Sequence, residues 1–253
     1  MTERWRRGVF LAGAAVLAAF ILWGLAGLPG FGHYPGPYGD IINRIAVAQT
    51  NATAAVSAVN FGYRAFDTLG EEFILFAAAA GVATVLRHLR GEDTVSTRKA
   101  ALDRVAPPAS DALRTAALAF TGPAIVLGWW LATHAQTSPS GGFQGGVLLT
   151  TGFVLVYLAG QVLLFRRASP EDLTDIAGAV GAGGFAAVGI TALPLGLPFL
   201  SNYLPLGSMP GAVSSSGTIA LISFLVGIEV GAAFLLIIGE LMDQALLVRE
   251  GRT

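Results

Sequence analysis

The stretch ISFLVGIEVGAAFLLIIGEL, residues 222–241, is apolar except for Ser223 and two glutamates. An apolar run of about 20 residues, folded as a helix, is long enough to cross a hydrocarbon core of about 30 Å. The stretch therefore predicts a membrane-spanning helix. Runs of the same kind recur along the chain and give six candidate spans, at about 8–28, 69–87, 112–133, 143–165, 173–196 and 217–241.

The overall composition also indicates a membrane protein. Hydrophobic residues make up 54% of the chain and charged residues 12%, whereas an average soluble domain carries about 25% charged residues. We therefore expect an all-α integral membrane protein. The chain has no cysteine, which excludes disulfides, thiolate metal sites and cysteine-bound iron–sulfur clusters within it. The formal net charge of −1 gives no indication of nucleic-acid binding.

Basic residues predict how the chain crosses the membrane, because lysine and arginine are enriched in cytoplasmic loops. With six spans and both termini in the cytoplasm, only Arg44 and Arg64 fall on the outer side. All other basic residues then lie on the cytoplasmic side: Arg4, Arg6, Arg7, Arg87, Arg90, Arg98, Lys99, Arg104, Arg114, Arg166, Arg167, Arg249 and Arg252.

The outer loop, residues 29–68, is too long for a simple connection. It begins with a turn-rich stretch of proline and glycine and continues, at 41–61, with apolar residues at helical spacing among polar ones. We predict an amphipathic helix there, lying at the extracytoplasmic surface or packed on a partner. The charged stretch 91–111 is a predicted cytoplasmic linker. It divides the chain into residues 1–90, with two spans, and residues 112–253, with four.

Acidic side chains occur at the start of the second span. An ionisable group in the hydrocarbon region costs about 2.5–3.5 kcal/mol on insertion scales, so each is a candidate functional residue. Asp67 and Glu71 share one helix face, whereas Glu72 points about 100° away. One interpretation is that Asp67 caps the helix and that the helix dipole favours Glu72 in the first turn. Glu71 precedes an uninterrupted apolar run, which favours a role in an ion or proton relay.

Glu229 lies near the middle of the last span, between Gly227 and Gly231. These glycines form a small-xxx-small pair that allows close helix approach. The carboxyl group at this depth is either a neutral hydrogen-bond donor between helices or a participant in ion movement. Glu240 follows eleven residues later on nearly the same helical stripe, about 16 Å away. It is an interfacial acid or, with Glu229, marks a path from the inner surface towards the middle of the membrane.

A glycine-rich corner, HAQTSPSGGFQGG at residues 134–146, precedes the fourth span. It contains two overlapping GxxxG pairs, which let helix backbones come into contact, so we expect a fixed structural corner beside a polar passage. A plain tight loop is the alternative. The corner consists of Gly141, Gly142, Phe143, Gln144, Gly145 and Gly146, with Gln144 able to hydrogen-bond and His134 as a polar neighbour.

The sequence contains no Ser-His-Asp pattern, no nucleotide-binding loop and no metal-ligand spacing. We therefore expect no catalytic residues, no metal and no cofactor in this chain. If the protein works near redox chemistry, its partners carry the cofactors.

The phrase HAQTSPSGGFQGGVLL resembles the signature of the B subunit (MnhB family) of Mrp-type multisubunit sodium/proton antiporters. The similarity covers about residues 112–245, and IEVGAAFLLIIGEL resembles the last helix of that family. The first half has its own resemblance, over about residues 30–88: NATAAVSAVNFGYRAFDTLGEE is similar to the end of the C-terminal extension of the A subunit, with Ala65 in place of the usual glycine. By this match Glu71 takes the place of the family's intramembrane glutamate.

The resemblance implies an accessory subunit in a hetero-oligomeric complex of a bacterial or archaeal cytoplasmic membrane. The implied partners are large antiporter-like subunits, small hydrophobic subunits, the lipid bilayer, sodium ions and protons. The GGFQGG corner would pack against the neighbouring small subunits. Membrane arms of energy-converting hydrogenases contain the same two modules, so a redox-driven ion pump is a second hypothesis. A purely structural scaffold is a third.

Overall fold

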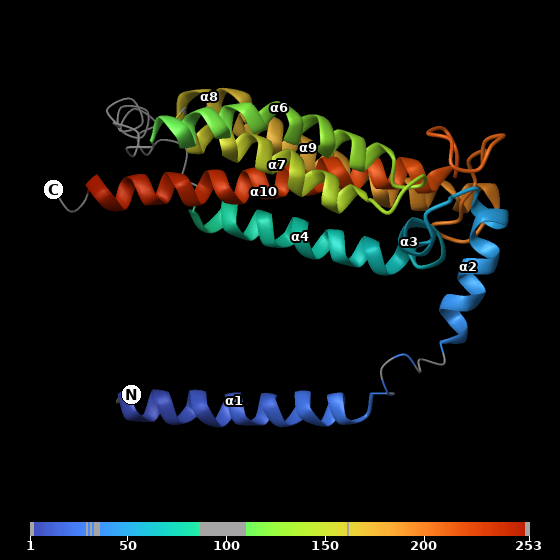
Figure 1. Ribbon diagram of the computed structural model, residues 1–253, viewed down its shortest axis with the longest axis horizontal. Helices are drawn as coiled ribbons and strands as arrows, with labels where there is room; N and C mark the ends of the chain where they lie inside the picture. Colours follow the sequence, from blue (N-terminus) through green and yellow to red (C-terminus); the bar gives the residue numbers. More distant parts are fainter. Residues whose placement is uncertain are drawn as a thin grey trace. The chain divides into compact units, whose positions relative to one another are not determined.

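The computed structural model describes residues 3–28, 30, 32, 36–86, 110–160 and 162–250. Most of the predicted linker at 91–111 falls outside these residues. The described chain is helical and contains no strand (Figure 1), which confirms the predicted all-α class. The helices are α1 (Glu3–Ala26), α2 (Pro37–Thr50), α3 (Ala55–Ala58), the π-helical turn η1 (Val59–Tyr63), α4 (Ala65–Leu86), α6 (Asp111–Thr133), α7 (Gly142–Leu158), α8 (Val162–Ala168), α9 (Glu171–Thr191), the 3-10 turn η2 (Leu193–Leu195) and α10 (Thr218–Glu250).

Five helical segments in the described residues are long and apolar enough to cross a membrane, which makes the chain a multi-pass membrane protein. They correspond to the first, second, third, fifth and sixth predicted spans: Arg7–Ala26, Ala65–Leu86, Asp111–Thr133, Glu171–Leu195 and Thr218–Met242.

The predicted fourth span, 143–165, is wrong as a single continuous helix. α7 has 17 residues and ends at Leu158, and α8 begins only at Val162. The interruption lies at Gly160, whose φ of +81° is in the left-handed region and whose N–H donates to the Tyr157 carbonyl at 2.8 Å. A helix that reaches such a residue cannot continue with regular geometry, because the left-handed conformation turns the backbone away from the helix axis.

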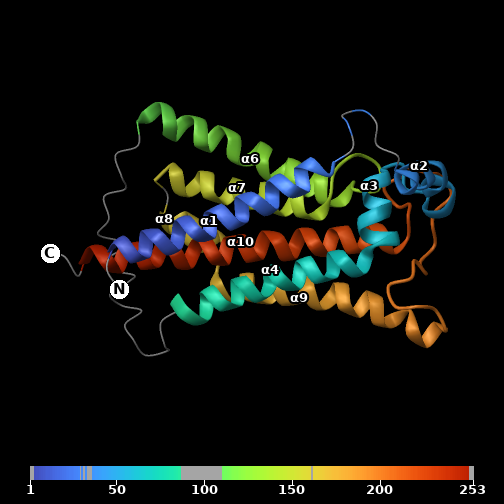
Figure 2. The same cartoon turned by 90° about the horizontal axis from the view of Figure 1, so that it is seen from below.

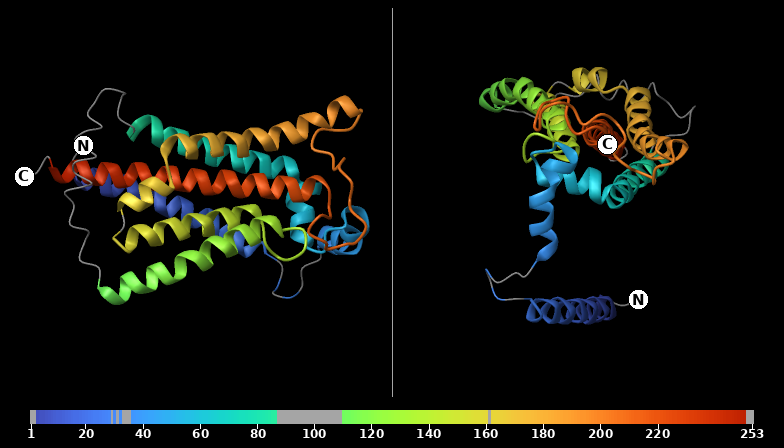
Figure 3. Two further views of the ribbon diagram at one scale, coloured as in Figure 1. Left: turned by 90° about the horizontal axis from the view of Figure 1, so that it is seen from above. Right: turned by 90° about the vertical axis from the view of Figure 1, so that its right-hand side faces the viewer.

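The chain divides into two compact units, residues 1–41 and residues 42–253. The first consists of α1 and the beginning of α2. The second is a bundle of helices around α10, which contacts α4, α6, α7 and α9. Figure 2 shows α6 and α7 on one side of α10 and α4 and α9 on the other, and the end-on view in Figure 3 shows α10 surrounded by the other helices of the bundle.

The core of the second unit forms along one stripe of α10. Ile219, Ile222, Val226 and Val230 recur at intervals of three and four residues and are all buried, which is the spacing that keeps side chains on one helix face. They pack against buried aromatic and aliphatic residues from α4, η1 and α9, among them Phe61 and Phe185. The last apolar run of the sequence is therefore the central element of the fold.

The predicted amphipathic helix at 41–61 is present but divided. α2 ends at Thr50, Asn51 has a φ of +53°, and a new helix begins at Ala55. The Asn51 side chain donates to the carbonyls of Leu206 and Gly207, at 3.1 and 3.0 Å. These contacts fix the break, since asparagine tolerates the left-handed conformation when its amide has partners. The side of the membrane on which this segment lies stays a prediction.

Candidate functional site

Glu229 of α10 is deeply buried, with 1% of its surface exposed, compared with 7% for Glu240 on the same helix. Neither of its carboxyl oxygens has a hydrogen-bond partner among the described residues. α9 approaches it through Gly181, where an added Cβ would lie 2.6 Å from the Glu229 Cβ and 2.7 Å from its backbone nitrogen. Backbone therefore covers Glu229 on the α9 side, and its carboxyl group is left to interact with α4.

Glu72 is the α4 residue that meets it. Its side chain is 3% exposed, and its carboxyl group lies close enough to that of Glu229 for the two groups to interact electrostatically. Glu72 Oε2 and both Glu229 oxygens are buried and have no hydrogen-bond partner among the described residues. We call Glu72 and Glu229 the carboxyl pair.

The chemistry of the carboxyl pair follows from its surroundings. Two ionised carboxylates side by side in a low-dielectric interior repel each other and have lost their hydration. The pair is stable when a proton is shared between the two groups or when a cation lies at their oxygens. A site that transfers protons or cations must be able to switch between a proton-bound state and a cation-bound state of this kind.

The other acidic residues predicted from the sequence lie elsewhere. Glu71 is exposed on the surface of this chain, one residue before Glu72. Asp67 is half exposed and forms an ion pair with Arg64, whose Nε donates to Asp67 Oδ2 at 2.6 Å. Glu240 is buried, near the far end of α10. The structure thus brings Glu72, rather than Glu71, to Glu229.

The glycine-rich corner joins three helices. An added Cβ at Gly142 would collide with the Ser223 carbonyl oxygen of α10, and one at Gly146 would lie 2.7 Å from the Val230 Cβ. Gly145 faces the other way, where an added Cβ would lie 2.7 Å from the Ala132 nitrogen of α6. α7 is therefore in backbone contact with α10 through one glycine pair and with α6 through another glycine.

The remaining corner residues have smaller roles. Gly227 and Gly231 lie opposite Gly142 and Gly146 on α10, and an added Cβ at Gly227 would also lie 2.7 Å from the Ala132 Cβ. Gly141 is buried under the Gln144 side chain, which is exposed, and the Phe143 ring meets Phe234 edge-on with centroids 6.3 Å apart. His134 stacks on Trp130, and its Nδ1 lies 2.9 Å from the Trp130 carbonyl oxygen.

The chain matches, over residues 112–236, the family described as the domain related to the MnhB subunit of Na+/H+ antiporters. Residues 112–236 form an MnhB domain. This confirms the resemblance inferred from HAQTSPSGGFQGGVLL. The MnhB domain contains Glu229 and the whole glycine-rich corner, whereas Glu72 lies before its first residue.

Two solved structures and a curated relative are also similar to this chain. A chain of the membrane-bound sulfane sulfur reductase, an archaeal respiratory membrane complex, is 26% identical with a TM-score of 0.71, covering 94% of this chain and 98% of that one. A chain of the Mrp complex from Dietzia sp. is 20% identical to this chain and has the same fold, with a TM-score of 0.69. The match covers 95% of this chain and 26% of the Dietzia chain. A Rhizobium meliloti protein, described as a probable A/B subunit of a K+/H+ antiporter, is 26% identical over 65% of this chain, but over only 18% of its own length.

The glycines of the GGFQGG corner make contacts within the MnhB domain. Gly142, Gly145 and Gly146 are buried against α10 and α6, whereas Phe143 and Gln144 are exposed. The expected packing of the corner against neighbouring small subunits stays a prediction, and Phe143 and Gln144 are the corner residues available for it.

Gln136, the fully buried amide of the MnhB domain, was not predicted from the sequence. Its Nε2 donates to the Val213 carbonyl at 2.7 Å, and its backbone carbonyl accepts from the Thr53 N–H at 2.9 Å. The corner loop is thereby held to two segments that are distant in the sequence. A glutamine in a polar loop carries no sequence signal of burial, since only the tertiary contacts decide it.

Proposed function

We propose that this chain is a subunit of a Mrp-type multisubunit cation/proton antiporter complex, and that Glu72 and Glu229 form part of its proton or sodium pathway. The observation that carries the proposal is the carboxyl pair: two buried carboxyl groups, from α4 and α10, that face each other with three oxygens lacking hydrogen-bond partners. Buried acids without partners are costly in a membrane protein, so they are retained for function. The MnhB domain supports the class of complex.

Glu71 belongs to the same proposal as the acid that faces away from this chain. It is exposed, adjacent to Glu72 in the sequence, and close enough to interact electrostatically with it. An exposed acid in one component of a membrane complex is available to a neighbouring component. We therefore propose Glu71 as the link between the carboxyl pair and a partner, with residues 1–90 and 112–253 as the two functional modules.

Glutamine substitutions test the carboxyl pair. We expect Glu72→Gln and Glu229→Gln to abolish or strongly depress cation/proton exchange in everted vesicles, with normal amounts of assembled complex, because the amide keeps the shape but cannot exchange a proton. Glu71→Gln should depress exchange less completely. The double variant Glu72→Gln/Glu229→Gln should lose no more than either single variant, since residues that act as a unit are not additive.

The matched control is Asp172→Asn, an acid exposed in the first turn of α9, which should exchange normally. Normal exchange by an assembled Glu229→Gln complex would contradict the pathway role. If Glu72→Gln also exchanged normally, the chain would be a structural scaffold whose acids are neutral and buried.

A redox-driven membrane complex is the second candidate. It is favoured by the match to the sulfane sulfur reductase chain, which this chain covers almost entirely. Purification of the tagged chain from its native membrane in mild detergent, followed by mass spectrometry of what accompanies it, distinguishes the two. Antiporter-like and small hydrophobic subunits alone favour the antiporter, whereas iron–sulfur subunits favour the redox-driven complex.

A further inference from the structure

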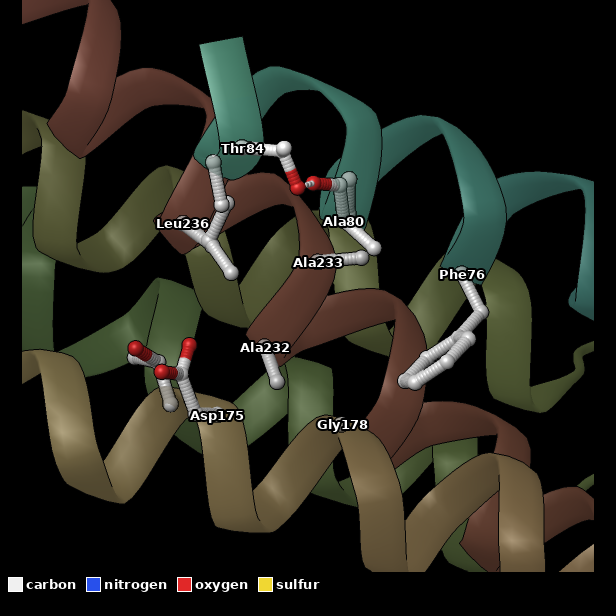
Figure 4. Close-up of a pocket in the computed structure, with 11 residues that line it drawn as sticks. Phe76, Ala80, Thr84, Asp175, Gly178, Ala232, Ala233 and Leu236 are labelled. Carbon is white, nitrogen blue, oxygen red and sulfur yellow. Dashed lines mark hydrogen bonds between the residues drawn. The ribbon is translucent and has the colours of Figure 1, made fainter. Parts of the chain in front are cut away.

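A pocket of about 260 Å³ lies between α4, α9 and α10 (Figure 4). A single water needs roughly 10–15 Å³ of such space, so the pocket is large enough for a chain of waters. Most of its wall is made of small side chains, among them Ala79, Ala83, Gly178 and Ala233. Its wall also includes Ala80 and Thr84, which are exposed on the surface of the chain.

The inner end of the pocket lies about one helical turn from the carboxyl pair on all three helices. Phe76 follows Glu72 by four residues, Ala233 follows Glu229 by four, and Gly178 precedes by three the Gly181 that packs on Glu229. One turn is about 5.4 Å. The pocket therefore begins beside the pair and extends towards the ends of the helices marked by Leu86 and Glu171, which the basic residues predict to be cytoplasmic.

The lining changes from apolar to polar along this direction. Phe76 and alanines line the inner end, and Thr84, Thr174 and Asp175 line the outer end. Figure 4 shows the Asp175 carboxylate on α9 opposite the α4 wall. An acid at the mouth of a narrow, low-dielectric passage raises the local concentration of cations. Glu240, buried four residues beyond Leu236 of the pocket wall, continues the same α10 stripe outward.

We propose that this pocket is a water-filled entrance through which small cations or protons reach the carboxyl pair from the cytoplasmic side, with Asp175 as the acid that attracts them at its mouth. The inference rests on the proposed function, because the entrance serves the ion pathway. Whether water-soluble molecules can enter the pocket, however, can be measured without measuring transport. The entrance leads to Glu229 from one direction only. In the other direction along α10, the buried side chains of Val226, Ile222 and Ile219 are apolar and fill the stripe.

Cysteine labelling tests the proposal, because the chain has no cysteine of its own. Ala233→Cys places a thiol at the inner end, and Ala78→Cys is the matched control, at similar depth on α4 but outside the pocket. The assembled complex is exposed, in everted and in right-side-out vesicles, to a membrane-impermeant cationic methanethiosulfonate, and the mass of this chain is followed. We expect Ala233→Cys to react at least 10-fold faster than Ala78→Cys in everted vesicles, and not to react in right-side-out ones.

The role of Asp175 has its own readout. Adding Asp175→Asn to Ala233→Cys should slow modification by the cationic reagent several-fold and leave modification by a neutral reagent of the same size unchanged. Ala79→Cys provides a second position if Ala233→Cys fails to assemble.

Equal rates for Ala233→Cys and Ala78→Cys, or faster reaction from the outer side, would overturn the proposed entrance. An Asp175→Asn effect that is the same for both reagents would overturn the electrostatic role. Because labelling requires no exchange activity, these results are independent of the glutamine variants: a labelled pocket beside glutamates that prove dispensable would refute the pathway and leave the entrance standing.

Discussion

At the scale of single residues, the main question for α4 is which of two adjacent glutamates faces α10. Glu71 and Glu72 are neighbours in the sequence, and about 100° of helix rotation decides which one faces α10. Thr68, Leu69 and Ala79 are buried on the Glu72 side. The run after the acids is apolar on every face, so its pattern does not reveal which face packs inward. The sequence thus places both acids at the start of one span, and packing against α10 decides which of them faces Glu229.

At Gly142 the backbones of α7 and α10 are too close to leave space for a side chain. We expect Gly142→Ala to destabilise the chain by about 1–3 kcal/mol, the range typical of overpacking, because its methyl group would meet the backbone carbonyl of Ser223, which has no flexible side chain to move aside. The measurement is thermal unfolding of the detergent-solubilised complex, followed by size-exclusion chromatography.

Gly183→Ala is the matched control, since Gly183 of α9 has no neighbouring atom within 4 Å of an added Cβ. It should be neutral or slightly stabilising, because alanine is the better helix former by roughly 1 kcal/mol. Equal stability of the two variants would contradict the close contact between α7 and α10.

At the scale of elements, the apolar runs locate the helices, and the interruptions between them are less visible. Asn51 and Gly160 both take positive φ values and end helices that the hydrophobic pattern alone would continue. The glycine at position 160 is a weak sequence signal for the end of a helix. Asn51 gives almost no such signal, because its conformation depends on contacts with residues more than 150 positions later.

Asn51 connects the end of α2 to the loop before α10, so replacing its side chain should loosen that loop. We expect Asn51→Ala to increase hydrogen exchange at the Gly211 amide, which donates to the Asn51 carbonyl at 3.0 Å, because alanine disfavours the left-handed conformation and lacks the side-chain amide. Ser214→Ala, at an exposed position of the same loop, serves as the control. Unchanged exchange at Gly211 in Asn51→Ala would mean that other contacts hold the loop.

At the scale of the whole molecule, the carboxyl pair joins two segments separated by the predicted linker. α4 packs on α10 and α9, and the Thr53 and Ser57 hydroxyls donate to carbonyls of the corner loop, at 2.9 Å to Thr137 and 2.6 Å to Ala135. Both segments are predicted as modules from the sequence, with acids in each. That they meet could not be predicted, since it depends on packing between distant parts of the chain.

These contacts predict that the linker is dispensable once the chain has folded. We expect a chain cut at a protease site inserted within 91–111 to remain as one complex in mild detergent, because helix packing and the hydrogen bonds of the corner loop hold its two pieces together. Co-purification through a tag on the C-terminal piece is the measurement, with the uncut chain as the control. Loss of the N-terminal piece after cutting would show that the covalent connection is needed.

The glycine contacts of α7 also determine which parts of the molecule are free to move. Where backbone touches backbone, as at Gly142 and Gly146, α10 cannot slide or rotate past α7 without steric collision. Beside the pocket, on the opposite side of α10, this helix meets α4 largely through alanines, where a rigid-body shift meets less resistance. In a working cycle that alternately opens and closes the approach to Glu229, we therefore expect α6, α7 and α10 to stay together as a frame and α4 to move.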